Sequence, residues 1–448
     1  MDERTFHLVS LGCAKNTVDS NTMAQLLQRD GYRSVIDPNQ ADVILVNTCG
    51  FIEPAREESY SILSELAANK AEGQLLIAAG CLTQRYGREV VERVPGIDGL
   101  LGTRRWMDIV QVLKELREGG SPQPLYHLPQ VPVVGQTPPS TIGAHLEGGS
   151  SYLKIADGCR RPCAFCAIPG IKGSLVSRPA ASILEDARYL QSQGVKEINL
   201  IAQDTTDYGH DLGLKDGLAS LLSSLVKEVP EVDWFRILYA YPGYITDRLI
   251  DVMAENKQIL PYIDMPLQHA DPEILRSMRR PSNLDWVYQT VDKLRARMPD
   301  LALRTTFIVG YPGETEKSFQ TLVDFIKEIE FDRVGVFKFS YEPGTASQEL
   351  GDPIPADVKE HRQETLMLAQ QEISLKKNQL QIGRKLDVLV EGLGEVEGSA
   401  ELISLGRSYR DAPEIDGMVI VEGELPVGKI APVQITGALV YDLTGIPS

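Results

Sequence analysis

Hydrophobic residues gather in short runs near the start of the chain, and segments with a helical pattern separate these runs. The runs have the length and β-branched content of buried strands, and they are FHLVSLGC (6–13), VILVNTCGF (43–51) and LLIAAGCL (75–82). Helical patterns cover residues 19–30 and 54–69. Because strands that alternate with helices form parallel sheets, the pattern predicts a parallel α/β domain over residues 4–118.

The next segment has no periodic pattern. Residues 119–150 hold six prolines and six glycines, a composition typical of a linker. The alternation then resumes over residues 151–375, with six predicted strands: YLKIAD (152–157), EINLIAQD (197–204), WFRILYA (234–240), YIDMPLQ (262–268), LRTTFIVG (303–310) and RVGVFKFS (333–340). Six βα units predict an open, partial TIM-like (β/α)6 barrel, whose functional residues gather at the C-terminal ends of the strands.

A different pattern follows a predicted helix at about 355–381. From 378 to 446, short hydrophobic runs alternate with turns that contain Gly or Pro, and these runs are KLDVLVEG (385–392), AELISLG (400–406), GMVIVEG (417–423) and APVQITGALVYDL (431–443). Several short strands separated by such turns predict a small β-barrel of the OB type. The chain is thus expected to be an α/β multidomain protein.

Composition and charge narrow the class of protein. The 448 residues carry a formal charge of −17, which argues against a nonspecific nucleic-acid coat, because such proteins have a basic excess. No run reaches the roughly eighteen apolar residues that cross a bilayer, and the start, MDERTFHLVS, lacks the pattern of a signal peptide. We therefore expect a cytoplasmic protein with no membrane partner, whose cysteines are thiols or metal ligands and not disulfides.

Three of the six cysteines follow the predicted strands of the first domain. Cys13, Cys49 and Cys81 each stand beside a glycine at the C-terminal end of a strand. In a parallel sheet these ends share the edge where ligands bind, so residues far apart in sequence are expected to converge there. Three buried cysteines that act as small hydrophobic residues are the alternative, but their equivalent positions favour a shared site.

The other three cysteines form one compact motif. In GCRRPCAFC, Cys159, Cys163 and Cys166 have C-x3-C-x2-C spacing and occupy the first βα loop of the predicted barrel. A structural zinc site closes with four ligands, and the nearest histidines lack ligand spacing. Three thiolates on a [4Fe–4S] cluster leave one iron open to a ligand from outside the protein. The motif therefore favours such a cluster over zinc.

This loop resembles the cysteine loop of the radical S-adenosylmethionine (SAM) superfamily. There the open iron binds SAM, and cleavage of SAM yields a 5′-deoxyadenosyl radical that abstracts hydrogen from unreactive carbon. Phe165 matches the aromatic residue that typically precedes the last cysteine. The segment TTFIVGYPGE (305–314) resembles the superfamily's glycine motif beside the adenosine. The resemblance thus implies that Phe165, Gly310 and Gly313 contribute to SAM binding.

Over its whole length the chain is similar to the methylthiotransferases, which join a three-cysteine N-terminal domain, a radical SAM core and a C-terminal TRAM barrel in this order. The family's three N-terminal cysteine motifs are matched by SLGCAKNTVDS (10–20), NTCGFI (47–52) and AAGCL (78–82). The resemblance implies that Cys13, Cys49 and Cys81 hold a second [4Fe–4S] cluster, whose open iron carries the inserted sulfur or methylthio group. It also implies an external sulfur source and an electron donor such as flavodoxin or ferredoxin.

Four segments resemble the RimO branch of this family, which adds a methylthio group to the β-carbon of an aspartate in small-subunit ribosomal protein uS12. They are GCAKNTVDS (12–20), KGSLVSRP (172–179), IAQDTTDYG (201–209) and MPLQHADPEILRSMRRPS (265–282). Two alternatives stay open. One is the branch that modifies an adenosine in tRNA, and the other is a non-catalytic iron–sulfur or zinc protein that binds the ribosome.

The charge of the C-terminal region favours the ribosomal-protein branch. Residues 381–448 contain five basic and eleven acidic side chains, a balance of −6. RNA binding depends largely on cations that neutralise phosphate, whereas an acidic surface suits a basic protein, although a solvated surface without a partner would have the same charge. Arg178, Arg236 and Arg304 lie near strand ends and are candidates for binding the target aspartate, unless each belongs to a structural ion pair.

Overall fold

A parallel sheet forms the N-terminal domain. The computed structural model describes residues 4–119, 124–129, 141–395 and 402–448, and within them the sheet has the parallel order β2-β1-β3-β4-β5-β6. Its strands are β1 (Arg4–Ser10), β2 (Tyr32–Ser34), β3 (Val43–Thr48), β4 (Leu75–Gly80), β5 (Gly99–Gly102) and β6 (Leu125–His127). Its helices are α1 (Ala14–Arg29), α2 (Glu53–Ala68), α3 (Cys81–Tyr86), α4 (Arg88–Arg93) and α5 (Ile109–Gly119).

Alternate residues of these strands serve two separate hydrophobic cores. On one face, Leu45 of β3 belongs to a core with Met23 and Leu27 of α1. On the other face, Ile44 belongs to a core with Leu63 of α2. Because successive side chains of a strand point to opposite faces, a strand covered by helices on both sides must be hydrophobic throughout. This explains the unbroken apolar runs that predicted the domain.

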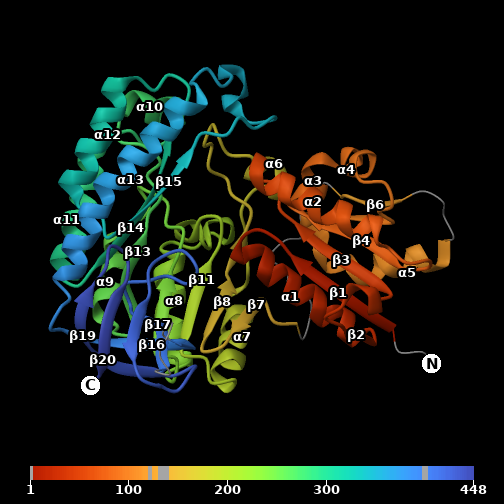
Figure 1. The fold of residues 1–448 in the computed structure, drawn as a ribbon, viewed down its shortest axis with the longest axis horizontal. Coiled ribbons are helices and arrows are strands. Elements are labelled where there is room, and N and C mark those ends of the chain that lie inside the picture. Colours follow the sequence, from red (N-terminus) through yellow and green to blue (C-terminus); the bar gives the residue numbers. More distant parts are fainter. Residues whose placement is uncertain (1–3, 120–123, 130–140, 396–401) are drawn as a thin grey trace.

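The middle of the chain folds as an open barrel (Figure 1), which confirms the predicted class of fold. In the described residues the sheet order is β15-β14-β13-β12-β11-β8-β7, with β8 to β15 parallel and β7 antiparallel to β8. The strands are β7 (Ala144–Glu147), β8 (Ser150–Lys154), β11 (Glu197–Ile201), β12 (Trp234–Ile237), β13 (Ile259–Asp264), β14 (Ala302–Val309) and β15 (Arg333–Lys338), with a small antiparallel pair, β9 (Ala156–Asp157) and β10 (Val176–Ser177), after β8.

Helices cover the outside of this barrel. They are α6 (Ile168–Lys172), α7 (Ala180–Ser192), α8 (Gly217–Glu228), α9 (Asp247–Glu255), α10 (Pro272–Ser277), α11 (Leu284–Arg297), α12 (Glu316–Ile329) and α13 (Ala356–Gln379). The longest, α13, lies where a helix at 355–381 was predicted. It runs down the outside of the barrel toward the C-terminal domain (Figure 1).

The C-terminal domain is a closed barrel of five strands in the described residues, in the order β16-β17-β18-β20-β19. The strands are β16 (Lys385–Glu395), β17 (Leu402–Arg407), β18 (Val419–Glu422), β19 (Ile430–Ala438) and β20 (Leu443–Pro447). Arg407 of this domain binds Glu197, the first residue of β11, at 2.6 Å. The small barrel therefore docks at the N-terminal ends of the large barrel's strands, opposite the ends where chemistry gathers.

The expected linker contains short strands of both neighbouring domains. Within 119–150, β6 pairs with β5 as the edge of the first sheet, and β7 pairs with β8 as the edge of the barrel. Gly- and Pro-rich composition indicated a break in periodicity but not these edge pairings, because a strand of three or four residues is too short to show a period. Residues 120–123 and 130–140 lie outside the described part.

Helix α1 joins the N-terminal domain to the barrel. Val18 of α1 is fully buried in a core with Tyr152 and Ile201 of the barrel strands. The side chain of Asn21 donates to the carbonyl of Ala144 at 2.7 Å. The barrel's β7–β8 edge is thus covered by a helix of the other domain, as an open sheet edge requires. Within the described residues, no helix has the length and apolar character to cross a membrane.

Candidate functional site

The three N-terminal cysteines meet at one edge of the first sheet. Cys13 precedes α1 directly after β1, Cys49 follows β3, and Cys81 begins α3 directly after β4. In the order β2-β1-β3, the chain reverses direction across the sheet between β1 and β3, and ligands bind at such a switch point. Two of the cysteines, Cys13 and Cys49, therefore flank the switch point itself.

Close backbone contacts hold these loops together. A Cβ atom on residue 12, whose φ is +91°, would lie 2.8 Å from Cβ and 3.1 Å from Sγ of Cys49. A Cβ atom on residue 50 would lie 2.6 Å from Cα of Leu82. Only glycine fits where two chains approach so closely. The glycines beside the cysteines therefore bring the loops after β1, β3 and β4 into contact.

Asn16 ties the same loops together with hydrogen bonds. Its side-chain amide donates to the carbonyls of Leu11 and Thr48, at 2.9 and 3.1 Å. The thiol of Cys81 lies 3.8 Å from the amide oxygen of Asn16. The hydroxyl of Ser59 accepts from the backbone N–H of Cys49 at 3.0 Å. The position of each loop is thus fixed by neighbouring side chains as well as by the sheet.

The second set of cysteines lies on one loop of the barrel. The backbone N–H of Cys159 donates to the carbonyl of Gly173 at 3.1 Å, and that of Cys166 donates to Cys163 at 3.1 Å. The N–H of Ala164 donates to the carbonyl of Met278 at 2.9 Å. This loop is therefore fixed both to the end of α6 and to the segment after α10.

Arginine and tyrosine side chains surround Cys163. A guanidinium nitrogen of Arg280 lies 3.5 Å from its sulfur, and the hydroxyl of Tyr241 lies 3.9 Å away. The Arg280 guanidinium also stacks over the Tyr241 ring at 4.2 Å. Arg161 stacks over Tyr244 at 3.5 Å and binds Asp204 at 2.7 Å. A thiolate at Cys163 would therefore find a cationic donor already in place.

The residues expected at SAM pack beside this loop. Phe165 packs against a small core that contains Met278, Tyr311 and Phe339, so it reaches the turn that follows β14. Gly310 and Gly313 of this turn have φ of 73° and 92°, a left-handed conformation that favours glycine. No atom outside the adjacent residues lies within 4 Å of a Cβ built on Gly313. The turn thus has open space at Gly313, whereas the side chain of Lys359 fills the space beside Gly310.

Buried ion pairs hold the turn in place. Glu314 accepts hydrogen bonds from the backbone N–H of Gly310 and from Arg362, the latter at 3.0 Å. It also lies 3.2 Å from the ring of His269. The carboxylate is fully buried, so these partners are needed to compensate its lost hydration. Their effect is to fix the backbone of the glycine turn.

The two cysteine sets lie close together at the junction of the domains. Cys81 packs against Ala167 and Ile171, which follow Cys166 directly along the chain, and Figure 1 shows α6 beside α3. The guanidinium of Arg104 donates to the carbonyl of Ile171 at 2.8 Å. A helix from the barrel loop thus separates the two sets and touches both of them.

A cavity opens beside this junction. It has a volume of about 620 Å³ and is lined by Cys163, Cys166, and residues of both domains. Glu342, in the loop after β15, binds Arg56 at 3.1 Å and Arg85 at 2.8 Å. These ion pairs hold the barrel loop against α2 and α3. The cavity is large enough for a drug-sized ligand.

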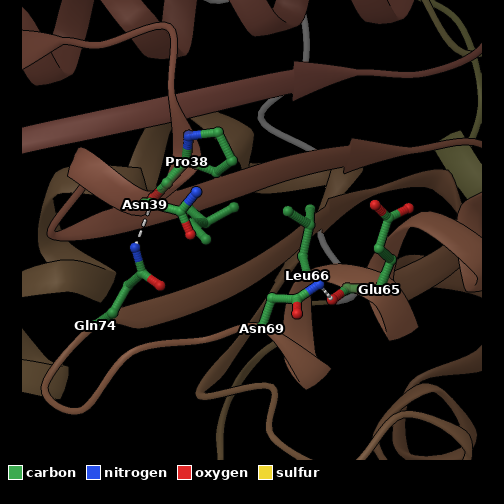
Figure 2. A pocket seen from close by; sticks show the side chains of 7 residues that line it. Pro38, Asn39, Glu65, Leu66, Asn69 and Gln74 are labelled. Atoms are coloured by element: carbon green, nitrogen blue, oxygen red, sulfur yellow. Dashed lines mark hydrogen bonds between the residues drawn. The ribbon is translucent and has the colours of Figure 1, made fainter.

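A second pocket lies far from the cysteines. It has a volume of about 320 Å³ and is lined by Pro38, Asn39, Ile44, Glu65, Leu66, Asn69 and Gln74. In Figure 2, Gln74 and Asn69 make hydrogen bonds to backbone groups within the pocket wall. Ile44 and Gln74 lie at the N-terminal ends of β3 and β4, opposite the edge that carries Cys49 and Cys81. This pocket therefore does not belong to the candidate site.

The three arginines that sequence suggested for aspartate binding already have carboxylate partners. Arg178 binds Asp186 at 2.6 Å, Arg236 binds Glu197 at 2.8 Å, and Arg304 binds Asp264 at 2.8 Å. Arg178 and Arg236 are also completely buried. Each of the three arginines therefore belongs to a structural ion pair, which was the alternative to binding the target aspartate.

Sequence reasoning missed other cations near the cysteines. Lys15 lies two residues after Cys13, in the first turn of α1, with its ammonium 3.3 Å from the centre of the Tyr239 ring. Burial opposes its charged form, but Tyr239 and the Cys13 thiol outweigh burial, so the pKa of Lys15 is raised. Lys15 and Arg280 both belong to quoted motifs, GCAKN and MRRPS. The contact of Arg280 with Cys163 has no local signal, because the two residues are 117 positions apart. The burial of Lys15 against Tyr239 likewise depends on the tertiary fold.

The donor set of each triad suits an iron–sulfur cluster. All six cysteines are free, and three thiolates without a fourth protein ligand leave an open iron. Burial raises the pKa of Cys81 and Cys166 to about 12 and that of Cys159 to about 11. Binding to a metal must therefore displace their protons. Among the described residues, no three His, Cys, Asp or Glu side chains form a ligand group for a metal ion, so the cluster ligands remain predictions.

Comparison with known proteins identifies the three regions. Residues 5–102 match the uncharacterized protein family UPF0004, residues 153–326 match the radical SAM superfamily, and residues 382–447 match the TRAM domain. Among solved structures, the radical SAM methyltransferase TsrM from Kitasatospora setae has a similar fold, with a TM-score of 0.59 and 13% identity over 88% of this chain and 79% of TsrM. The fold and the two cysteine triads thus define a radical SAM enzyme with an added three-cysteine domain.

Closer relatives give the particular family. The ribosomal protein uS12 methylthiotransferase RimO of Chloroflexus aurantiacus is 48% identical over 98% of this chain and 99% of its own length. RimO of Syntrophotalea carbinolica is 42% identical over 99% of this chain and 97% of its own length. The chain belongs to the RimO family of radical SAM methylthiotransferases.

Proposed function

We propose that this protein adds a methylthio group to the β-carbon of an aspartate in ribosomal protein uS12. The observation that carries the proposal is the meeting of two separate three-cysteine sets at one domain junction, where Cys81 packs against the residues that follow Cys166. Membership of the RimO family supports the same activity, since its relatives carry this name over their whole length. The enzyme class is a transferase with [4Fe–4S] clusters and SAM as cofactors.

We assign the cluster ligands by triad. Cys159, Cys163 and Cys166 hold the SAM-binding cluster, and Cys13, Cys49 and Cys81 hold the second. When bound, the clusters and SAM supply the radical and sulfur-transfer chemistry, with electrons from a donor such as flavodoxin or ferredoxin and sulfur from an external source. The protein's own residues would position these groups.

In the proposed function, the residues around the barrel triad have different roles at the SAM-binding cluster. Arg280 donates toward the sulfur of Cys163 and offsets its charge. Phe165 fills the space between the cysteine loop and the turn after β14. Gly310 and Gly313 give that turn its left-handed backbone. Gly313 leaves room for SAM, whereas the side chain of Lys359 lies where a Cβ on Gly310 would point.

The proposed limits of the domains follow the sequence pattern. They are 4–118 for the three-cysteine domain, 119–150 for the linker, 151–375 for the radical SAM core and 378–446 for the TRAM barrel. The UPF0004 and radical SAM matches lie inside these limits, and the TRAM match, 382–447, ends one residue beyond them. Edge strands β6 and β7 make the linker part of both neighbouring sheets.

Charge on the TRAM barrel supports a basic protein as the partner in place of tRNA. Most of its cations already have carboxylate partners: Arg407 binds Glu197 and Glu391, Arg410 binds Asp332, and Arg384 binds Asp300. In the described residues of this domain, only Lys385 and Lys429 remain as exposed cations without an ion pair. Phosphate binding needs free cations. A cytoplasmic location, where ribosomal proteins are made, completes the proposal.

Mass spectrometry tests the function directly. Reconstituted enzyme, SAM, a reductant and a sulfur source are incubated with purified uS12 and, in parallel, with unmodified tRNA. We expect one methylthio group on an aspartate of uS12 and none on tRNA. Modification of the tRNA alone would assign the protein to the other branch, and SAM cleavage without any transfer to either substrate would also contradict the proposal.

A further inference from the structure

Three buried lysines lie at the junction of the two cysteine sets, and one of them has no carboxylate partner. Lys15, Lys154 and Lys172 are 8%, 3% and 2% exposed. Lys154 and Lys172 each bind both Asp19 and Asp157, with distances of 2.6 to 3.2 Å for three of these contacts. Within the described part of the chain, Lys15 makes no ion pair with any carboxylate. The difference separates two lysines that are held by carboxylates from a third that is not.

The ammonium of Lys15 is held by a tyrosine and a thiol instead of a carboxylate. An ammonium group has three donor protons, and the ring of Tyr239 at 3.3 Å offers a cation–π contact. The Tyr239 hydroxyl and the Cys13 thiol also attract it. None of these groups is a carboxylate. A charged group whose pKa is shifted by burial and by specific neighbours is a candidate for a functional role.

The position of Tyr239 is held under strain. Its φ is 61°, a region that non-glycine residues rarely adopt. The backbone N–H of Tyr239 donates to the carboxylate of Asp264 at 3.0 Å, and its carbonyl accepts from Thr205 at 3.1 Å. Backbone strain that is held in place by neighbouring residues tends to occur at binding sites. It keeps the ring beneath Lys15 at the C-terminal end of the barrel strands.

Lys15 lies close to an exposed residue. Cys13 is exposed, and Lys15 follows two residues further along the chain, in the first turn of α1. The next turn contacts the barrel interior, since Val18 packs against Tyr152. An anionic group that enters beside Cys13 therefore meets Lys15 between the three-cysteine domain and the barrel.

We propose that Lys15 binds the side-chain carboxylate of the target aspartate and so selects an acidic residue of a protein over a nucleobase. This inference rests on the proposed function, because it assumes that the substrate is an aspartate. Adenine offers no anion for an ammonium to bind, so the same lysine would hinder the substrate of the tRNA branch through an unpaired buried charge. Arg178, Arg236 and Arg304 cannot take this role, since their carboxylate partners occupy them.

A double-mutant cycle tests the contact. The enzyme carries Lys15→Gln, and uS12 carries its target aspartate replaced by asparagine; binding of both uS12 forms to both enzymes is measured by fluorescence anisotropy. Loss of a charged hydrogen bond should weaken binding of native uS12 about tenfold or more. The asparagine form should bind both enzymes equally, because the two changes remove the same contact. Lys15→Arg should restore a large part of the affinity.

Controls separate this inference from other roles. Lys293→Gln removes an exposed lysine on α11 and should bind uS12 like the native enzyme. Iron content and SAM cleavage without uS12 should be unchanged in Lys15→Gln. Loss of iron from this variant would assign Lys15 to the cluster, and additive effects in the cycle would assign it to folding; either result overturns the inference. Failure of the native enzyme to modify uS12 would contradict the proposed function instead.

Discussion

The two cysteine triads are built in opposite ways. The N-terminal triad draws on three loops that are 36 and 32 residues apart and meet because the strands before them are neighbours in one sheet. The barrel triad lies within eight residues of a single loop. The first is assembled by the tertiary fold, whereas the second is already specified by local sequence. A loop motif can therefore be transferred between barrels, but the N-terminal triad depends on the whole domain.

Their electrostatic surroundings also differ. Arg280 and Tyr241 crowd the sulfur of Cys163, and Arg161 lies over the neighbouring tyrosines. In the N-terminal triad, Cys13 is exposed, and Lys15 and Lys172 are the cations that act on its cysteines. Hydrogen bonds and charge near the sulfurs help set the potential of a cluster. The contrast is in keeping with our proposal, in which the barrel triad holds the SAM-binding cluster and the N-terminal triad holds the second cluster.

The largest effect should come from the barrel triad. Replacing Cys159, Cys163 or Cys166 by Ala should abolish 5′-deoxyadenosine formation and all methylthio transfer, because SAM cleavage depends on this cluster. About half of the iron should be lost. Chromatography of the products and iron analysis give the two readouts. A single variant that still cleaved SAM at the native rate would remove these cysteines from the SAM site.

The N-terminal triad should separate the two activities. Changing Cys13, Cys49 and Cys81 together to Ala should also remove about half of the iron and stop methylthio transfer. Reductive cleavage of SAM should continue, because the barrel loop has its own anchors at Gly173 and Met278. The barrel-triad variants are the matched controls. Continued sulfur insertion by the triple variant would show that the second triad has another purpose.

The difference between the triads also explains what sequence could predict. The barrel triad and the strands before all six cysteines were visible as local motifs and hydrophobic runs, so the class of fold was predicted correctly. The carboxylate partners of Arg178, Arg236 and Arg304 were not visible, because Asp186, Glu197 and Asp264 come from other elements. Lys15 was missed for the same reason, since the absence of a partner becomes apparent only once every neighbouring element is in place.

Arg280 should tune the barrel cluster without being needed to hold it. Arg280→Met should leave iron content intact but make the cluster harder to reduce, since a cation beside the Cys163 sulfur stabilises the more negative, reduced state. A roughly tenfold loss in the reduction equilibrium corresponds to about 59 mV for one electron. Redox titration followed by electron paramagnetic resonance measures this shift. Arg280→Lys, which keeps the charge, is the matched control and should recover most of the potential; equal potentials in both variants would contradict a role for charge.

The smallest effect should come from the rim of the TRAM barrel, which lies at the opposite end of the barrel strands from the triads. Charge reversal at Glu395, Glu397 and Glu401 would test attraction of basic uS12, but Glu397 and Glu401 lie outside the described residues. Exposed Glu422 and Glu424 beside β18 can replace them. Changing Glu395, Glu422 and Glu424 to Lys should weaken uS12 binding about three- to tenfold, because exposed charge pairs contribute little individually.

Measuring uS12 binding over a series of salt concentrations tests whether the loss of affinity is electrostatic. Attraction between exposed charges is screened over roughly 8–10 Å at physiological ionic strength, so the difference between native and reversed enzyme should shrink as salt rises. SAM cleavage without uS12 should stay unchanged, since the triads lie in other domains. The added lysines should also raise affinity for tRNA by supplying phosphate contacts. Unchanged uS12 affinity across the salt series, or tight tRNA binding by the native enzyme, would remove the acidic barrel from substrate selection and leave that selection to the junction around Lys15.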